Sequence, residues 1–286
     1  MQKNIRTDLA LEAHEISQRT AKQINGVILH ECKKGNLKIS RLEVINDEGA
    51  KIIGKAQGNY ITIEAPNIKY DTDEFENACE ATASELVKMA QITPDTTTLV
   101  VGLGNRSMTP DALGTSAIDE ILVTNHMKNQ YSQAFGEGIS SVCAITPGVL
   151  GTTGIETVDT IKSVAQSLKP DLIIAIDALA AADLSRLCTT IQLSDAGIQP
   201  GSGVGNDRKG LNEETLGTKV ISIGVPTVID AYNICDIEIP EEISPMMVTV
   251  KDIDLVIKRM ASAVAGGINL ALHKGLTLRD IMCFMG

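Results

Sequence analysis

The stretch LIIAIDALAA, residues 172–181, places one carboxylate inside an otherwise aliphatic and small-residue run. Its first part, residues 172–176, is short, continuous and apolar, which is typical of a strand buried on both faces of a parallel sheet. A charged group at the end of such a run costs several kcal/mol unless it is paired, hydrogen-bonded or protonated. Asp177 therefore needs either a compensating partner or a function that uses a perturbed carboxylate.

Strands and helices alternate on both sides of this stretch, from residue 97 onward. Apolar runs bounded by turn residues predict strands at 97–103, 140–145, 171–176, 189–193 and 219–225. Apolar residues at helical spacing predict helices at 110–127, 154–168, 178–187 and 252–274. This alternation implies an α/β fold, a mostly parallel sheet with helices on both faces, similar to phosphorylase/hydrolase-like folds.

The N-terminal part follows a different pattern. Strand-like runs at 26–32, 37–45 and 59–65, separated by Gly and Asn turn residues, predict a small antiparallel element over 26–65. A helix follows at 73–91, with acidic residues in its first turn. By length we expect a single domain over residues 1–286, in which residues 1–5 form a short N-terminal extension.

The composition narrows the class of partner. Hydrophobic residues make up 43% of the 286 residues and aromatic ones 2%, with a formal net charge of −11. This charge opposes attraction to DNA and to anionic membranes, and so few aromatic rings leave little surface for base stacking. We therefore expect no direct nucleic-acid partner and no membrane partner. The start of the chain has no apolar signal segment, which favours an intracellular, cytoplasmic protein with reduced cysteines.

Two aspartates are expected at one edge of the sheet. Ligands of open parallel sheets bind outside the carboxyl ends of the strands. Asp177 is expected to end its strand there. Asp111 follows the strand at 97–103 through a loop, in a helix start with Thr109 as N-cap and Pro110 as first helical residue. The sequence thus predicts two carboxylates that converge at this edge.

Each aspartate also has a structural explanation. Asp111 suits a helix start, where a carboxylate complements the helix dipole, and Asp177 could cap a helix at 178–187. If both are functional, two like charges a few Å apart share one proton. One carboxylate then acts as general base on water while the other donates to a carbonyl oxygen, as in aspartic peptidases. A metal-bound pair is the rival interpretation, because Asp carboxylates also hold Mg²⁺ or Ca²⁺.

Other motifs carry less weight. The stretch VGLGNRSMTPD, residues 101–111, lacks the third glycine of a dinucleotide-binding turn, and PGSGVGND, residues 200–207, lacks the Lys of a P-loop. These motifs therefore give no reason to expect a cofactor. Asp195 and Asp230 follow strand-like runs and are second-rank candidates for the same edge. The irregular stretch 196–217 is long enough to be functional.

Six stretches of the chain closely resemble, in the same order, the germination protease family of endospore-forming bacteria. Together with the final helix they span most of the sequence, which makes the match specific. They are RTDLALEA (6–13), VVGLGNRSMTPDALG (100–114), TPGVLGTTGIET (146–157), KPDLIIAIDALAA (169–181), TTIQLSDAGIQPGSGVGN (189–206) and IGVPTVIDA (223–231).

The resemblance implies an endopeptidase that degrades small acid-soluble spore proteins at the start of germination. The family's two essential aspartates lie in its PDALG and IDALA motifs, which correspond here to Asp111 and Asp177. The loop 196–206 is expected to hold the substrate chain extended. The resemblance also implies a homo-tetramer in the spore core, with no obligatory catalytic metal.

The family pattern is not complete in this chain. Members are made as zymogens that lose a short propeptide, but five residues precede RTDLALEA here, so a full propeptide is not expected. The segment between IGVPTVIDA and the last helix is also shorter than in longer members. Two other functions stay open: a catalytically inactive binding homologue, and a metal-dependent peptidase similar to the hydrogenase-maturation peptidases, which the GLGN stretch resembles more distantly.

Overall fold

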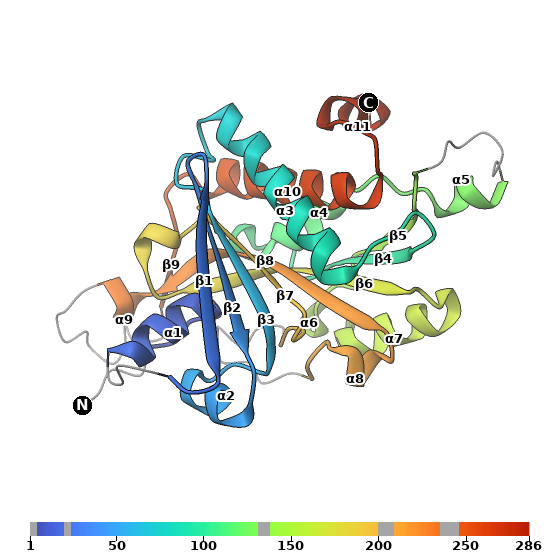
Figure 1. Cartoon of the computed structure of the whole chain (residues 1–286). Helices are drawn as coiled ribbons and strands as arrows, with labels where there is room; N and C mark the ends of the chain where they lie inside the picture. Colours follow the sequence, from blue (N-terminus) through green and yellow to red (C-terminus); the bar gives the residue numbers. More distant parts are fainter. Residues whose placement is uncertain (1–4, 20–23, 131–137, 200–208, 235–245, 286) are drawn as a thin grey trace.

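The computed structural model describes residues 5–19, 24–130, 138–199, 209–234 and 246–285. Within these residues, nine strands form one mixed sheet in the order β1-β2-β3-β7-β8-β6-β4-β5, and β9 pairs with β8 (Figure 1). Their bounds are β1 Val27–Lys34, β2 Leu37–Val44, β3 Gly58–Glu64, β4 Thr97–Gly102, β5 Ser141–Ile145, β6 Leu172–Ala181, β7 Thr190–Ser194, β8 Lys219–Asp230 and β9 Met247–Val248.

The sheet has a parallel half and an antiparallel half. Strands β8, β6, β4 and β5 run parallel to one another. Strands β1, β2, β3 and β7 are antiparallel, and β7 joins the two halves by pairing antiparallel with β8. The predicted α/β fold is confirmed, and the predicted parallel sheet describes one half of it. The antiparallel element expected at 26–65 is present and continues the same sheet.

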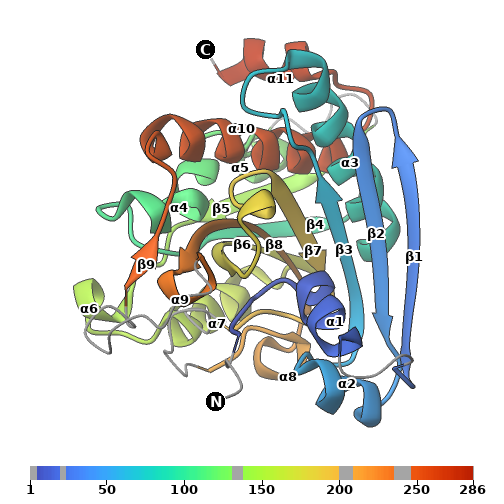
Figure 2. The ribbon, with the colours of Figure 1, turned by 90° about the vertical axis from the view of Figure 1, so that its left-hand side faces the viewer.

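Helices cover both faces of the sheet (Figure 2). In the parallel half, alternate residues of a strand enter different cores: Ile174 packs with α3, α4 and α10, whereas Ile173 packs with α7. The helices are α1 Ala10–Gln18, α2 Asp47–Ile53, α3 Thr72–Ala90, α4 Leu113–Ile118, α5 Asn125–Gln130, α6 Leu150–Thr153, α7 Thr157–Leu168, α8 Glu213–Leu216, α9 Ala231–Ile234, α10 Ile253–Leu272 and α11 Leu278–Met285, with short 3-10 turns η1 Thr109–Asp111 and η2 Leu184–Arg186.

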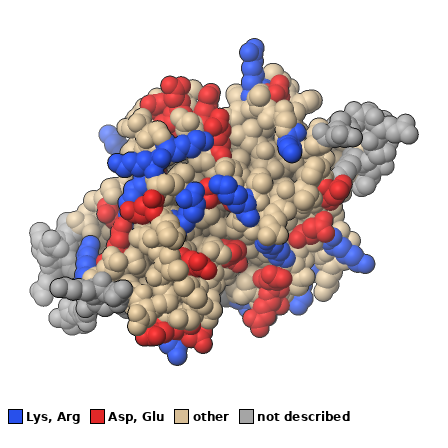
Figure 3. Space-filling view, viewed as in Figure 1, with Lys and Arg blue, Asp and Glu red and all other residues tan. Residues whose placement is uncertain are grey.

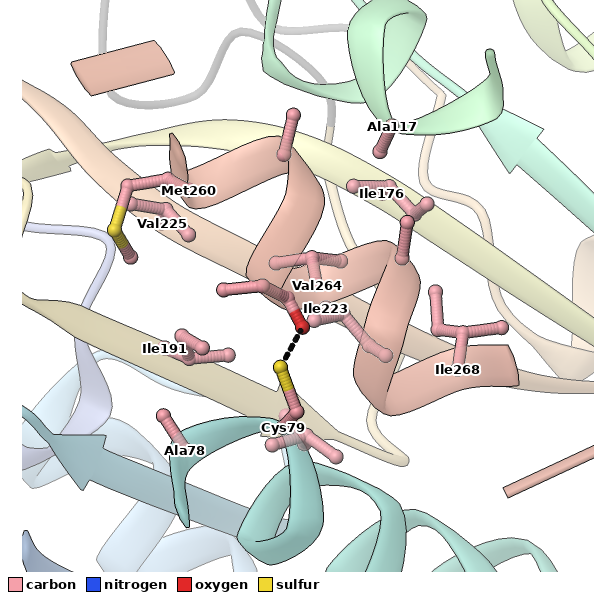
Figure 4. Packing of buried hydrophobic residues seen from close by; sticks show 14 of the residues in the cluster. Ala78, Cys79, Ala117, Ile176, Ile191, Ile223, Val225, Met260, Val264 and Ile268 are labelled. Atoms are coloured by element: carbon pink, nitrogen blue, oxygen red, sulfur yellow. Dashed lines mark hydrogen bonds between the residues drawn. The ribbon is translucent and has the colours of Figure 1, made fainter. Parts of the chain in front are cut away.

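Helix α10 is the most apolar of the long helices. By length and composition it could cross a membrane, but 72% of its apolar window is buried inside the protein. It packs against α3 so closely that the Cys79 thiol donates to the Ala263 carbonyl at 3.5 Å (Figure 4). A Cβ atom at Gly267 would lie 2.7 Å from the Thr82 side chain, so this helix pair requires a glycine. Helix α10 is therefore a core helix.

Two predicted helices are wrong. Residues 178–181 continue strand β6 and pair with β8 as far as Ile229, and a short 3-10 turn follows at η2. The pairing with β8 thus overrides the helix propensity of an alanine-rich run. The helix expected at 110–127 is divided into η1, α4 and α5, because the buried Asn269 side chain bonds the backbone of Glu120 and Leu122 at 2.7 and 2.9 Å.

Charged side chains of both signs share the surface. On the face seen in Figure 3, Lys and Arg side chains lie interspersed with Asp and Glu side chains. Although the net charge of the chain is −11, this face carries both signs of charge side by side.

Candidate active site

Asp177 lies inside strand β6, not at its end. It is paired in register with Gly224 of β8, and four further residues of β6 follow it. Its Oδ1 atom accepts a hydrogen bond from the Ala178 N–H at 3.0 Å, and the residue is only 5% exposed. Because residues 178–181 are strand, the suggested helix-capping role of Asp177 is wrong. The carboxylate shares a strand face with Ala175, which packs in the core under α7.

Asp111 ends the 3-10 turn η1 and is half-buried. Its Oδ2 atom accepts from the Asn105 N–H at 2.8 Å, while its own N–H donates to the Met108 carbonyl at 2.8 Å. Thr109 is not an N-cap as predicted, because Met108 occupies that position without a side-chain hydrogen bond. The carboxylate therefore closes the loop 105–111 on itself.

The base of this loop is fixed to the strand that carries Asp177. The Leu103 N–H donates to the Ile176 carbonyl at 2.8 Å, so the chain leaves β4 beside the residue that precedes Asp177. A Cβ atom at Gly114 would lie 2.4 Å from the same Ile176 carbonyl. Helix α4 can thus start against the backbone of β6 only with glycine at this position.

Gly104 serves the Asp111 turn in a similar way. Its φ is +94°, a conformation that favours glycine, and a Cβ atom there would lie 2.0 Å from the Asp111 carbonyl oxygen. The glycines of the 101–114 region therefore allow close backbone approach between β4, β6 and the Asp111 turn. This packing accounts for them without a bound phosphate group.

Asp111 and Asp177 line the same cavity, which has a volume of about 1440 Å³. Small-ligand pockets are typically about 300–1,000 Å³, so this cavity has room for an extended peptide chain. Its walls come from segments far apart in the sequence, including the N-terminal segment, the end of α2, β3, β7, β8 and β9. The structure thus places both predicted site residues in the lining of one large cavity.

The N-terminal segment RTDLALEA lies along the end of β6, a placement that the sequence did not predict. Asp8 N–H donates to the Ala180 carbonyl at 2.9 Å, and the Asp8 carboxylate accepts from the Ala180 N–H at 2.8 Å. Glu12 accepts from the N–H groups of Ala182 and Asp183 at 2.6 and 3.0 Å. Burial raises the pKa of Glu12, although these hydrogen bonds oppose the shift. The segment thereby holds the strand beyond Asp177.

Two cations accompany these carboxylates. Lys55 lines the cavity and donates to the Thr7 carbonyl at 2.9 Å. Burial lowers the pKa of Lys55, against the opposing effect of the nearby carboxylates of Asp8 and Glu12. Arg186 is 6% exposed and contacts three carboxylates, with a two-pronged bond to Glu15 at 2.6 and 2.7 Å and single contacts to Glu64 at 3.2 Å and Glu12 at 3.9 Å.

The second-rank candidates lie elsewhere. Asp195 accepts from the Asn59 backbone and side chain at 2.6 and 2.7 Å, and Asp230 accepts from the Tyr232 N–H at 2.9 Å. Neither is among the described residues that line the cavity. Their carboxylates serve local turns and strand ends.

Part of the predicted substrate loop 196–206 also lines the cavity. Residues 196–199 are on its wall, and residues 200–206 fall outside the described residues. Across the described part of the chain, no group of three or more His, Cys, Asp or Glu residues is gathered closely enough to hold a metal ion.

The comparisons with known proteins agree with one another on the family. The model of the germination protease family matches residues 5–244. The germination protease of Clostridium tetani is 42% identical over 99% of both chains. That of Caldanaerobacter subterraneus subsp. tengcongensis is 44% identical over 97% of both chains, and that of Priestia megaterium 39% identical over 95% of this chain and 94% of its own.

A solved structure is also similar, at a low level. The [NiFe] hydrogenase maturation protease of Thermococcus kodakarensis superposes with a TM-score of 0.32 and 16% identity, over 60% of this chain and 92% of its own. A likeness this low carries no argument about the site. The family match and the near full-length relatives show that the chain belongs to the germination protease family, and that it is a protease.

Proposed function

We propose that this protein is an endopeptidase that cleaves small acid-soluble spore proteins, and that Asp111 and Asp177 together activate the attacking water. The observation that carries the proposal is the presence of both carboxylates on the wall of one cavity with room for an extended chain. The substrate class rests on membership of the germination protease family.

The proposed chemistry uses two carboxyl groups that hold one proton between them. Like charges placed close together in a low-dielectric site do not both ionise, so one group is a carboxylate and the other a carboxylic acid. The carboxylate removes a proton from water as the water oxygen attacks the peptide carbonyl carbon. The carboxylic acid donates its proton to the carbonyl oxygen, and collapse of the tetrahedral intermediate then transfers a proton to the departing amide nitrogen.

The surroundings of the two aspartates suit unequal roles. Asp177 is 5% exposed and sits on a rigid strand between β4 and β8. Asp111 is half-buried, on a turn whose backbone hydrogen-bonds its own carboxylate. A pair of carboxyl groups in different surroundings is the arrangement in which one serves as acid and the other as base. The assembly as a homo-tetramer and the location in the spore core remain parts of the proposal that rest on the family alone.

The rival functions predict different results in one experiment. Purified spore protein is incubated with the wild type, with and without EDTA, and with folded Asp111→Asn and Asp177→Asn variants. Asp195→Asn is the matched control, because Asp195 also accepts a hydrogen bond from a backbone N–H but is not among the described residues that line the cavity. The proposal predicts cleavage in EDTA by the wild type and the control, and a loss of about 100-fold or more in each site variant.

Three results would contradict the proposal. Loss of wild-type cleavage in EDTA, restored by a divalent cation, would favour a metal-bound carboxylate pair. Full activity in either site variant would show that its aspartate has a structural role. A wild type that is folded but inert toward every spore protein tested would favour the inactive binding homologue.

A further inference from the structure

Strand β8 contains one residue that interrupts its pairing with β6. Leu179 is paired with Pro226 and the next residue, Ala180, with Val228, so Thr227 has no partner in the register. Proline lacks a backbone N–H and is confined to edges and bulges of sheets, which explains why the ladder breaks at this point. Thr227 is therefore the extra residue of a β-bulge, a feature that often redirects a side chain next to an active site.

The bulge directs Thr227 toward the turn that carries Asp111. The Thr227 hydroxyl donates to the carbonyl of Pro110 at 2.7 Å, and Pro110 immediately precedes Asp111. The carbonyl of Thr227 in turn accepts from the Thr249 hydroxyl, next to β9, at 2.6 Å. The Asp111 turn is thus attached by a side chain to β8, the strand that is paired with β6 at Asp177.

We propose that Thr227 is a positioning residue that sets Asp111 relative to Asp177, an inference that rests on the proposed function. Thr227 belongs to the cavity lining but is 0% exposed, and its hydroxyl is bonded to the Pro110 carbonyl, so we assign its effect to the Asp111 turn. The other attachments of the Asp111 loop, at Leu103 and Gly114, reach β6 through the backbone. Strand β6 lies between β4 and β8. The Thr227 hydroxyl adds a side-chain hydrogen bond from β8, so the Asp111 turn is held by both β6 and β8.

The effect of losing this hydroxyl follows from geometry. In Thr227→Val the side chain keeps its size and branching, but the Pro110 carbonyl loses its donor. A misplacement of a catalytic group by about 1 Å can reduce the rate by about 100-fold. Because Thr227→Val keeps the size and branching of a buried side chain in the cavity lining and removes only the hydroxyl bonded to the Asp111 turn, the change should appear in kcat and leave KM nearly unchanged.

The test compares kcat and KM of Thr227→Val and Thr227→Ser on purified spore protein, with Asp111→Asn measured in parallel. Thr190→Val is the matched control, since Thr190 is also 0% exposed and its hydroxyl has no hydrogen-bond partner among the described residues. We expect Thr227→Val to lower kcat by about 10- to 100-fold with KM within about twofold. Thr227→Ser, which restores a hydroxyl, should recover most of the rate, and Thr190→Val should match the wild type.

The outcomes separate the inference from the function on which it rests. Wild-type kcat in Thr227→Val, or a Thr227→Ser variant no faster than Thr227→Val, overturns the inference even if Asp111→Asn is inert. An active Asp111→Asn variant overturns the proposed function instead. If Thr227→Val does not fold, Thr249→Val is measured instead, because it removes the hydrogen bond that the Thr227 carbonyl accepts from the Thr249 hydroxyl. This variant must lower kcat without raising KM. Wild-type kcat in Thr249→Val would also overturn the inference.

Discussion

The Asp111 loop meets the parallel half of the sheet through glycines and a backbone hydrogen bond, whereas ion pairs join helices α1 and α3 to the antiparallel half and to the η2 turn that leads into it. Apart from Asp177, strand β6 carries only apolar side chains, and the Asp111 loop reaches it by a close approach at Gly114 and a backbone hydrogen bond from Leu103. Arg186 in η2 lies among three carboxylates, and Arg41 in β2 makes a two-pronged bond to the buried Glu85 at 2.7 and 2.9 Å. The position of the Asp111 loop thus depends on close backbone packing, whereas the attachment of α1 and α3 depends on ion pairs.

Removing Arg186, the buried cation of the η2 turn, should have the largest effect on stability. Arg186→Met leaves Glu12, Glu15 and Glu64 without the cation that they share. Breaking a buried ion pair from one side typically costs about 3–5 kcal/mol, and we expect a loss at the lower end of that range because Glu15 is partly exposed. Urea unfolding measures the loss of unfolding free energy.

The matched control for this change is Lys34→Met. Lys34 pairs with Glu80 at 3.3 Å, but both side chains are more than half exposed. Exposed pairs contribute about 0–1 kcal/mol, so this variant should unfold close to the wild type. Equal losses in the two variants would show that the Arg186 cluster is no more important than a surface ion pair.

A change of volume should have the next largest effect, in the parallel half. In Gly114→Ala the new Cβ atom would meet the backbone oxygens of Ile176 and Leu103 at 2.4 and 2.5 Å, and neither oxygen can move without moving its strand. Overpacking of this kind costs about 1–3 kcal/mol. Thermal unfolding is compared with Gly151→Ala, where a Cβ atom meets nothing within 4 Å and stability should not fall. A Gly114→Ala variant as stable as the wild type would contradict the close approach of α4 to β6.

The smallest effect is a difference in pH response. Burial raises the pKa of Glu12. Burial acts in the same direction on Glu85, but hydrogen bonds from Arg41 and Lys88 outweigh it and lower the pKa of Glu85. A raised carboxyl pKa contributes stability that is lost as pH rises through the folded-state pKa, and a lowered one contributes stability that is lost as pH falls through it.

The contributions of the two glutamates to the unfolding free energy should therefore change with pH in opposite directions. When the pH is lowered from about 7 to about 4, the unfolding free energy of the wild type should rise relative to that of Glu12→Gln. Over the same change of pH it should fall relative to that of Glu85→Gln. Urea unfolding of the three proteins at both pH values measures these differences. A common direction for the two variants would contradict the assigned surroundings of one glutamate.

The strands of the parallel half can be predicted from the sequence, but the contacts that join distant segments to the sheet cannot. Continuous apolar runs such as 172–176 mark buried strands, and the order of strands and helices in an α/β fold follows from their alternation. The same reasoning predicted Asp111 and Asp177 at one edge of the sheet; the structure places both in the lining of one cavity, with Asp177 inside its strand and not at the strand end.

What the sequence could not predict depends on contacts between distant segments. The small residues 178–181 have no period that separates strand from helix, and their pairing with β8 decides the outcome. The N-terminal segment carries Asp8 and Glu12, but nothing local indicates that they bond the end of β6. Pro226 inside an apolar strand was the available signal for the Thr227 bulge, because proline interrupts a ladder.

The most direct test of the central claim is a double-mutant comparison of Asp111→Asn, Asp177→Asn and the variant with both changes, measured as kcat on purified spore protein in EDTA. Residues that act as one catalytic unit are strongly non-additive, because removal of either member already abolishes the shared step. The account predicts that the double variant is no slower than the slower single variant. Losses that multiply in the double variant would contradict it, because the two carboxylates would then act independently.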